Sequence, residues 1–141
     1  MASISESSVD FETRSESKLL YSALTGEILS AAFEVHRELG PGLLESAYQA
    51  CLCHELSLRR IRYRTEVPLP VSYKDVRLEC GYRIDLVIDD KVAVELKSVD
   101  KILPIHQAQL LTYLRLSSLR VGLLMNFNVR MLKDEILRRV L

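Results

Sequence analysis

The chain has no stretch of apolar residues approaching the roughly 20 that a membrane-spanning helix requires. It also lacks an N-terminal basic segment followed by an apolar one, the pattern of a secretory signal. We therefore expect no membrane association and, by default, a cytoplasmic location. Its 141 residues, of which 48% are hydrophobic and 27% charged, suit one globular domain with one core.

Cysteine and glycine are scarce as well. The three cysteines, Cys51, Cys53 and Cys80, cannot all pair within one chain. The run formed by Cys51, Cys53 and His54 lacks the spacing of a zinc finger or ribbon, so we favour reduced thiols over zinc or an iron–sulfur cluster. With only 5 glycines, no glycine-rich phosphate loop is evident. A phosphoesterase for nucleotides or other small phosphorylated ligands is therefore the least favoured function.

Net charge is absent too, because Lys plus Arg and Asp plus Glu both number 19. A protein without a global basic field must bind nucleic acid, if at all, through local patches. One candidate patch has arginines around Tyr63, a combination that suits phosphate contacts and base stacking: Arg59, Arg60, Arg62 and Arg64. The alternative is a solvated helix end followed by a strand, since arginine also favours a helix C-terminus.

Apolar periodicity divides the chain into elements. Residues 1–17 are rich in serine and acidic residues and predict a flexible tail, which leaves 18–141 as a single domain. Apolar residues at three- and four-residue steps predict a helix from Leu19 to Leu39, and Gly40-Pro41-Gly42 ends it. The remaining pattern predicts helices at about 43–58 and 105–118, strands at 66–73, 76–89, 91–99 and 121–126, and strand, helix or both in the last dozen residues. This order indicates an α/β fold with a mixed central sheet flanked by helices.

The segment from Cys80 to Lys97 is the most informative. Ile84, Leu86 and Ile88 share one face of a predicted strand, and Asp85 lies on the other. In the following strand Val92, Val94 and Leu96 share a face opposite to Glu95 and Lys97, and Asp89-Asp90-Lys91 suits a short turn. Pairing Ile88 with Val92 aligns the two apolar faces, Ile84 with Leu96 included, and sets Asp85 opposite Glu95. A slip of one residue would separate the acids and expose an apolar row.

Two carboxylates held this close repel, so either one takes up a proton or a cation intervenes. Mg²⁺ suits such a pair, because it prefers hard oxygen ligands and retains several waters. Lys97 points to the same side as Glu95, where its ammonium can stabilise charge on a phosphate. The alternative is an ordinary surface hairpin with cross-strand ion pairs.

Asp85, the short hairpin and Glu95-Leu96-Lys97 together resemble the core motif of the PD-(D/E)XK nuclease superfamily. The run Gln109-Leu110-Leu111-Thr112-Tyr113 resembles the Gln-x-x-x-Tyr helix of its RecB-type branch. Upstream, Gly42-Leu43-Leu44-Glu45-Ser46-Ala47-Tyr48 resembles the signature of the small bacterial GxxExxY family, which is assigned to this superfamily. The resemblance covers approximately Leu20 to Leu141, and the departure is Ile84, where the superfamily's name has proline.

The resemblance implies a restriction-endonuclease-like core and a role for each matching residue. Asp85 and Glu95 would bind Mg²⁺ or Mn²⁺ with help from Glu45, Lys97 would be the catalytic lysine, and Gln109 and Tyr113 would complete the catalytic site. Tyr48 shares a helix face with Glu45 and is assigned, with the arginine patch, to nucleic-acid binding. Structural alternatives remain open: Glu45 as a first-turn acid, Gln109 with Tyr113 as a surface pair, and, as the favoured view, His36 and His106 in structural or surface roles.

The sequence thus predicts a divalent-metal-dependent nuclease acting on DNA, with RNA less favoured. The alternative is a non-catalytic module that keeps the nuclease fold and binds nucleic acid or protein. The small size and zero net charge motivate this alternative, in which a homodimer or a partner protein would select the target.

Overall fold

The computed structural model describes residues 20–141, so the tail predicted for residues 1–17 lies outside the described residues. Two helices come first, α2 (Ser22–Leu39) and α3 (Glu45–Leu58). The predicted end of the first helix is confirmed: Gly40 has a φ of 65° and its N–H donates to the His36 carbonyl. Glycine adopts this left-handed conformation without steric cost, so it closes the helix and turns the chain toward α3.

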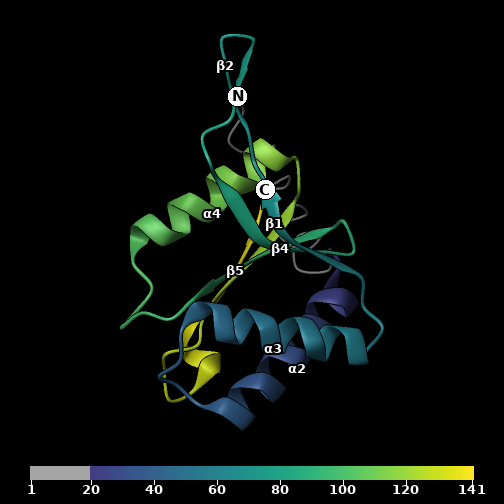
Figure 1. Cartoon of the computed structure of the whole chain (residues 1–141), viewed down its shortest axis with the longest axis vertical. Helices are drawn as coiled ribbons and strands as arrows, with labels where there is room; N and C mark the ends of the chain where they lie inside the picture. The colour runs from purple at the N-terminus through teal and green to yellow at the C-terminus, as the bar shows by residue number, and fades with distance from the viewer. Residues whose placement is uncertain (1–19) are drawn as a thin grey trace, which may run out of the picture.

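A five-stranded mixed sheet forms the centre of the molecule, with the strand order β1-β4-β5-β6-β7 (Figure 1). Only β5 and β6 run parallel, and the helix α4 (Pro104–Ser117) connects them. The other neighbouring pairs are antiparallel. The strands are β1 (Tyr63–Pro68), β4 (Arg83–Ile88), β5 (Val92–Lys97), β6 (Val121–Asn126) and β7 (Ile136–Val140), the last preceded by the 3-10 helix η1 (Leu132–Glu135).

Two predicted strands are wrong in extent. The segment 66–73 is divided between β1 and a separate short strand β2 (Val71–Tyr73), and 76–89 is divided between β3 (Val76–Leu78) and β4. Pro68 and Pro70 have no N–H to donate, which explains the first break. Strands β2 and β3 pair only with each other, as a hairpin that extends beyond the central sheet (Figure 1).

Helices cover both faces of the sheet. The larger buried cluster joins α2 and α3 to apolar residues of β4, β5 and β6, while a smaller one lies on the side of α4. Figure 1 shows α2 and α3 on one side and α4 on the other. At Gly122 the helix α4 approaches closely, because an added Cβ would lie 2.8 Å from Leu110 Cδ1. None of the helices within residues 20–141 is long and apolar enough to cross a membrane.

Candidate active site

The β4–β5 hairpin has the predicted register over three pairs: Ile88 with Val92, Val87 with Ala93 and Leu86 with Val94. Asp89 and Asp90 form its turn with φ values of 52° and 54°, the conformation of tight two-residue hairpins. The predicted pairing of Ile84 with Leu96 is wrong. Ile84 packs in the α4-side cluster, whereas Leu86, Ile88 and Leu96 belong to the opposite one.

The backbone ladder ends because the acidic side chains take over its hydrogen bonds. The Leu96 N–H donates to Asp85 Oδ2 at 2.8 Å, and the Asp85 N–H donates to Glu95 Oε1 at 3.1 Å. Each carboxyl group therefore accepts a hydrogen bond from the backbone of the other strand, and the two side chains are also hydrogen-bonded to each other. The two acids are brought together as predicted, at the point where β4 and β5 separate.

Burial and mutual repulsion make this pair hard to ionise. Glu95 is 8% exposed, and desolvation together with the charge of Asp85 raises the pKa of Glu95 to about 8. Desolvation also raises the pKa of Asp85, and the nearby charges of Glu66 and Glu45 act in the same direction. Lys97 opposes the shift at Glu95. The site thus concentrates negative charge that a cation would neutralise.

Helix α4 brings the predicted tyrosine to the acids. Tyr113 is 7% exposed, and the pKa of its hydroxyl is raised by burial and then by the charges of Glu95, Tyr82 and Asp85. Gln109 lies one turn earlier on α4 and is half-buried. Lys97, also half-buried, is the last residue of β5 and pairs with Asn126 of β6. Lys97 and Tyr113 therefore lie near the carboxylate pair on separate elements.

Glu45 reaches the same region from the first turn of α3. Its Oε2 accepts a hydrogen bond from the N–H of Ser98, the residue after Lys97, at 3.3 Å. The Ser98 hydroxyl donates to the Leu43 carbonyl, which ties the loop before α3 to the end of β5. Gly42 in this loop has a φ of 100°, and its N–H donates to Asn128. A glycine is needed there, three residues before the acid that it helps to place.

The prediction that Tyr48 contacts nucleic acid is wrong. It is fully buried, and its ring stacks on Phe127 with centroids 4.7 Å apart. Its hydroxyl donates to the Gly40 carbonyl and accepts from the Leu43 N–H. Tyr48 thus has no surface for nucleic acid, and instead holds the loop that precedes Glu45.

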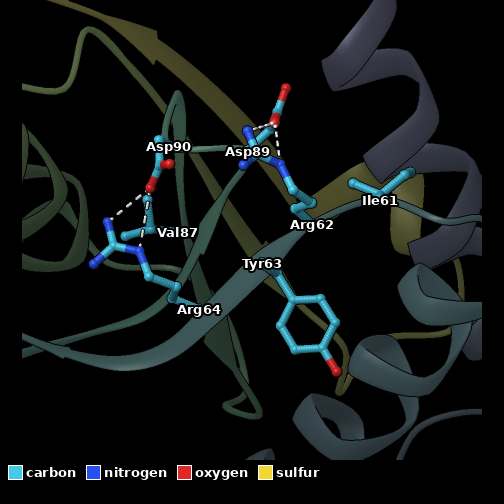
Figure 2. Close-up of a pocket in the computed structure, with 7 residues that line it drawn as sticks. All are labelled: Ile61, Arg62, Tyr63, Arg64, Val87, Asp89 and Asp90. Atoms are coloured by element: carbon cyan, nitrogen blue, oxygen red, sulfur yellow. Dashed lines mark hydrogen bonds and ion pairs between the residues drawn. The ribbon is translucent and has the colours of Figure 1, made fainter.

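The arginine patch does not converge on the acids. Arg62 and Arg64 pair with Asp89 and Asp90 of the hairpin turn, at 2.7 and 3.0 Å (Figure 2). That turn is four to six residues from Asp85 along β4 and from Glu95 along β5, roughly 15 Å at about 3.3 Å per residue. Figure 2 shows the Tyr63 ring directed away from these ion pairs, and Tyr63 packs against the α2/α3-side cluster rather than standing free to stack a base.

The rest of the predicted patch is divided. Arg59 is bound by Glu55 at 2.8 Å, whereas Arg60 is exposed.

Both histidines of interest make structural contacts: His36 Nε2 donates to the Val129 carbonyl, and His106 Nδ1 accepts from the Leu103 N–H at the start of α4. Cys51 and Cys53 are half-buried free thiols and Cys80 is an exposed one.

Three residues near the acids or Lys97 were missed by sequence reasoning. Glu66 of β1 acts on Asp85 through its charge and accepts a hydrogen bond from Gln49 of α3. Tyr82 precedes β4, and its ring centroid lies 6.1 Å from that of Tyr113. Neither has a local signal, because β1–β4 pairing and the packing of α4 bring them to the site. Asn126, fully buried, was also missed; it binds the Val99 backbone just after Lys97.

A family model described as the PD-(D/E)XK nuclease superfamily matches residues 22–140. The chain belongs to this superfamily. The match spans the sheet and all the described helices, and the fold is consistent with a restriction-endonuclease-like core. Searches of curated proteins and of solved structures find no match.

PD-(D/E)XK nucleases generally use divalent metals, and the donor set here fits such an ion. Asp85 and Glu95 supply carboxylate oxygens side by side, the hard donors that Mg²⁺ and Mn²⁺ prefer. Between residues 20 and 141 no group of three or more His, Cys, Asp or Glu side chains is arranged to hold a metal by itself. Two carboxylates completed by waters and substrate phosphate are a usual Mg²⁺ site, so the two observations agree.

Proposed function

We propose that this PD-(D/E)XK protein is a Mg²⁺- or Mn²⁺-dependent nuclease that hydrolyses phosphodiester bonds in DNA, with RNA as the less favoured substrate. The observation that supports it most is the buried Asp85–Glu95 pair, in which the pKa of Glu95 is raised to about 8. Folding brings two acids together at a cost that a bound cation offsets. Strongly raised pKa values of this kind cluster at functional sites.

In this proposal each residue near the pair has one task. Asp85 and Glu95 bind the ion, and Glu45 adds charge from α3. A divalent ion, when bound, polarises the phosphate and lowers the pKa of a water. As the water oxygen bonds to phosphorus and the bond to the leaving oxygen breaks, the Lys97 ammonium stabilises the charge that develops on the phosphate. Gln109 and Tyr113 orient the substrate beside the acids.

We also infer membership of the GxxExxY family and of the RecB-type branch. The spacing of the first motif has a physical reason in this fold. Gly42 supplies a left-handed turn, Glu45 reaches the end of β5, and the Tyr48 hydroxyl holds the intervening loop. The second motif includes Tyr113, and the charge of Glu95 raises the pKa of its hydroxyl.

The direct test incubates the purified protein with single- and double-stranded DNA and with RNA, in Mg²⁺ or Mn²⁺ and then in excess EDTA. We expect cleavage that stops in EDTA and that falls by at least about 100-fold in Asp85→Ala or Lys97→Ala, since each removes transition-state stabilisation. Asp134→Ala and Lys133→Ala are matched controls, because both residues are exposed on η1 and neither is among the charges that shift the pKa of Asp85 or Glu95. Cleavage that persists in the Asp85 or Lys97 variant would refute the assignment of the site.

One observation favours the second candidate, a non-catalytic interaction module. The ion pairs of Arg62 with Asp89 and of Arg64 with Asp90 neutralise the patch that would hold a duplex. If the chain shows no divalent-metal binding by calorimetry and forms a stable dimer by light scattering, the module is the better description. If the chain binds a divalent metal and cleaves nucleic acid only in its presence, the nuclease is the better description.

A further inference from the structure

Tyr82 stands out as an exposed aromatic ring beside the carboxylate pair. Its side chain is 44% exposed, yet the residue is fixed on two sides. Its carbonyl accepts a hydrogen bond from the Leu69 N–H at 2.9 Å, and its ring packs against that of Tyr113 at an interplanar angle of 59°. Tyr113 is itself buried in α4. The backbone of Tyr82 is therefore fixed, and its ring contacts Tyr113 while much of the residue stays exposed.

The position of this ring relates it to the chemistry. Tyr113 links Tyr82 to the acids: its ring contacts that of Tyr82, and it packs in the same buried cluster as Ile84, the residue before Asp85. The charges of Glu95 and Asp85 also raise the pKa of its hydroxyl. A planar ligand on the exposed part of the Tyr82 ring would lie one aromatic residue away from the proposed metal-binding acids. An immobilised aromatic ring also loses little side-chain entropy when a ligand stacks on it.

The charges of the protein indicate which nucleic acid this site takes. Affinity for a duplex comes mainly from cations that contact phosphates, and here the net charge is zero and Arg62 and Arg64 are paired. Single strands add a contribution that duplexes lack, because their open base faces stack on aromatic side chains in addition to the contacts of their phosphates. In a duplex those faces are already covered by neighbouring base pairs.

We propose that Tyr82 is a nucleobase-stacking platform that makes the site selective for single-stranded nucleic acid or for unpaired strand ends. This inference rests on the proposed nuclease function and names its substrate class. A base stacked on Tyr82 leaves the adjoining sugar-phosphate backbone on the side of Tyr113 and the carboxylates. Tyr82 then determines specificity, while Asp85, Glu95 and Lys97 perform the chemistry.

The chain has no tryptophan, so Tyr82→Trp introduces a single fluorescent reporter at the platform. In a Lys97→Ala background, which prevents cleavage, we expect oligo(dT) to quench this fluorescence with a saturable dependence on concentration. A blunt duplex and an abasic strand of equal length, which has the same phosphates but no bases, should not quench it. Tyr73→Trp is the matched control, since Tyr73 is 61% exposed on the separate β2–β3 hairpin; its fluorescence should not change.

Affinity gives a second measurement that does not depend on tryptophan. We expect Tyr82→Leu to weaken oligo(dT) binding about 5- to 150-fold, the usual range for losing one base–aromatic stack. Tyr82→Phe should retain binding, because the ring and not the hydroxyl stacks. Circular dichroism and thermal unfolding establish that each variant is folded, and Tyr73→Leu should bind as the unchanged chain does.

The outcomes separate this inference from the proposed function. Quenching by oligo(dT) without any cleavage by the unchanged chain would retain the platform and refute the nuclease. Cleavage of duplex and single strand at equal rates, unaffected by Tyr82→Leu, would retain the nuclease and refute the platform. Equal quenching by the abasic strand, or no binding of oligo(dT), also overturns the inference.

Discussion

Binding of a divalent cation should expel a proton from Glu95, and the number of protons released should depend strongly on pH. The pKa of Glu95 is raised from 4.5 to about 8, first by burial and then by the charge of Asp85. A metal ligand must be deprotonated before it binds. At pH 7 about 90% of Glu95 holds its proton, and at pH 9 only about 10% does.

Cation binding should therefore release about 0.9 proton at pH 7 and about 0.1 at pH 9. The apparent Kd should also fall roughly tenfold between these two pH values, because the deprotonated fraction rises by that factor. Calorimetry in two buffers of different ionisation enthalpy measures the release, as the slope of the observed enthalpy against the buffer enthalpy. Asp134→Asn should leave both quantities unchanged. Binding without proton release at pH 7, or with equal release at pH 9, would refute the reasoning.

The same shift affects the stability of the metal-free protein. Because the folded pKa of Glu95 is raised, the folded state holds a proton that the unfolded chain loses above pH 4.5. The free energy of unfolding should then fall as the pH rises from about 4.5 to 8, by at most about 5 kcal/mol at 1.4 kcal/mol per pH unit. Glu95→Gln should remove most of this slope in urea titrations, and an unchanged slope in that variant would contradict the assignment to Glu95.

The remaining predictions concern the loop before α3, the packing of α4 on the sheet, and Glu66. Tyr48→Phe should lower the free energy of unfolding by about 1–3 kcal/mol in urea, since the Gly40 carbonyl loses its donor; an unchanged value would refute its role in holding the loop. Gly122→Ala should lower the free energy of unfolding by about 1–3 kcal/mol, because its Cβ would meet a leucine of α4 at 2.8 Å. Gly26→Ala in α2 is the contrasting case: its Cβ would meet nothing within 4 Å, so it should raise the free energy of unfolding by about 0.5–1 kcal/mol. Glu66→Gln should weaken cation binding roughly two- to fivefold, the scale of one charge near a surface. Glu79→Gln, an exposed acid paired with an arginine, should have no such effect on affinity in the same calorimetric titration.

The order of helices and strands, and the hairpin of β4 and β5, were predictable from the sequence because both depend on local patterns. Alternating apolar residues favour one register across a short turn, and that register extends to Leu86 and Val94. Asp85 and Glu95 follow directly, and their side chains bind the backbone of the opposite strand. Gly42 and Glu45 were recognisable because they match a short family signature in which they stand three positions apart. Local spacing also placed Gln109 one turn before Tyr113 on α4.

Tertiary structure alone decided which of the candidates share the site. Tyr48 lies three residues from Glu45, yet the stacking on Phe127 buries it, and no pattern within one helix reveals a partner 79 positions away. Arg62 and Arg64 meet Asp89 and Asp90 because β1 pairs with β4, and that same pairing brings Glu66 toward Asp85. Pairing between strands distant in sequence depends on the burial of the whole sheet between its helices. The sequence therefore determined the carboxylate pair, and the packed sheet decided which side chains surround it.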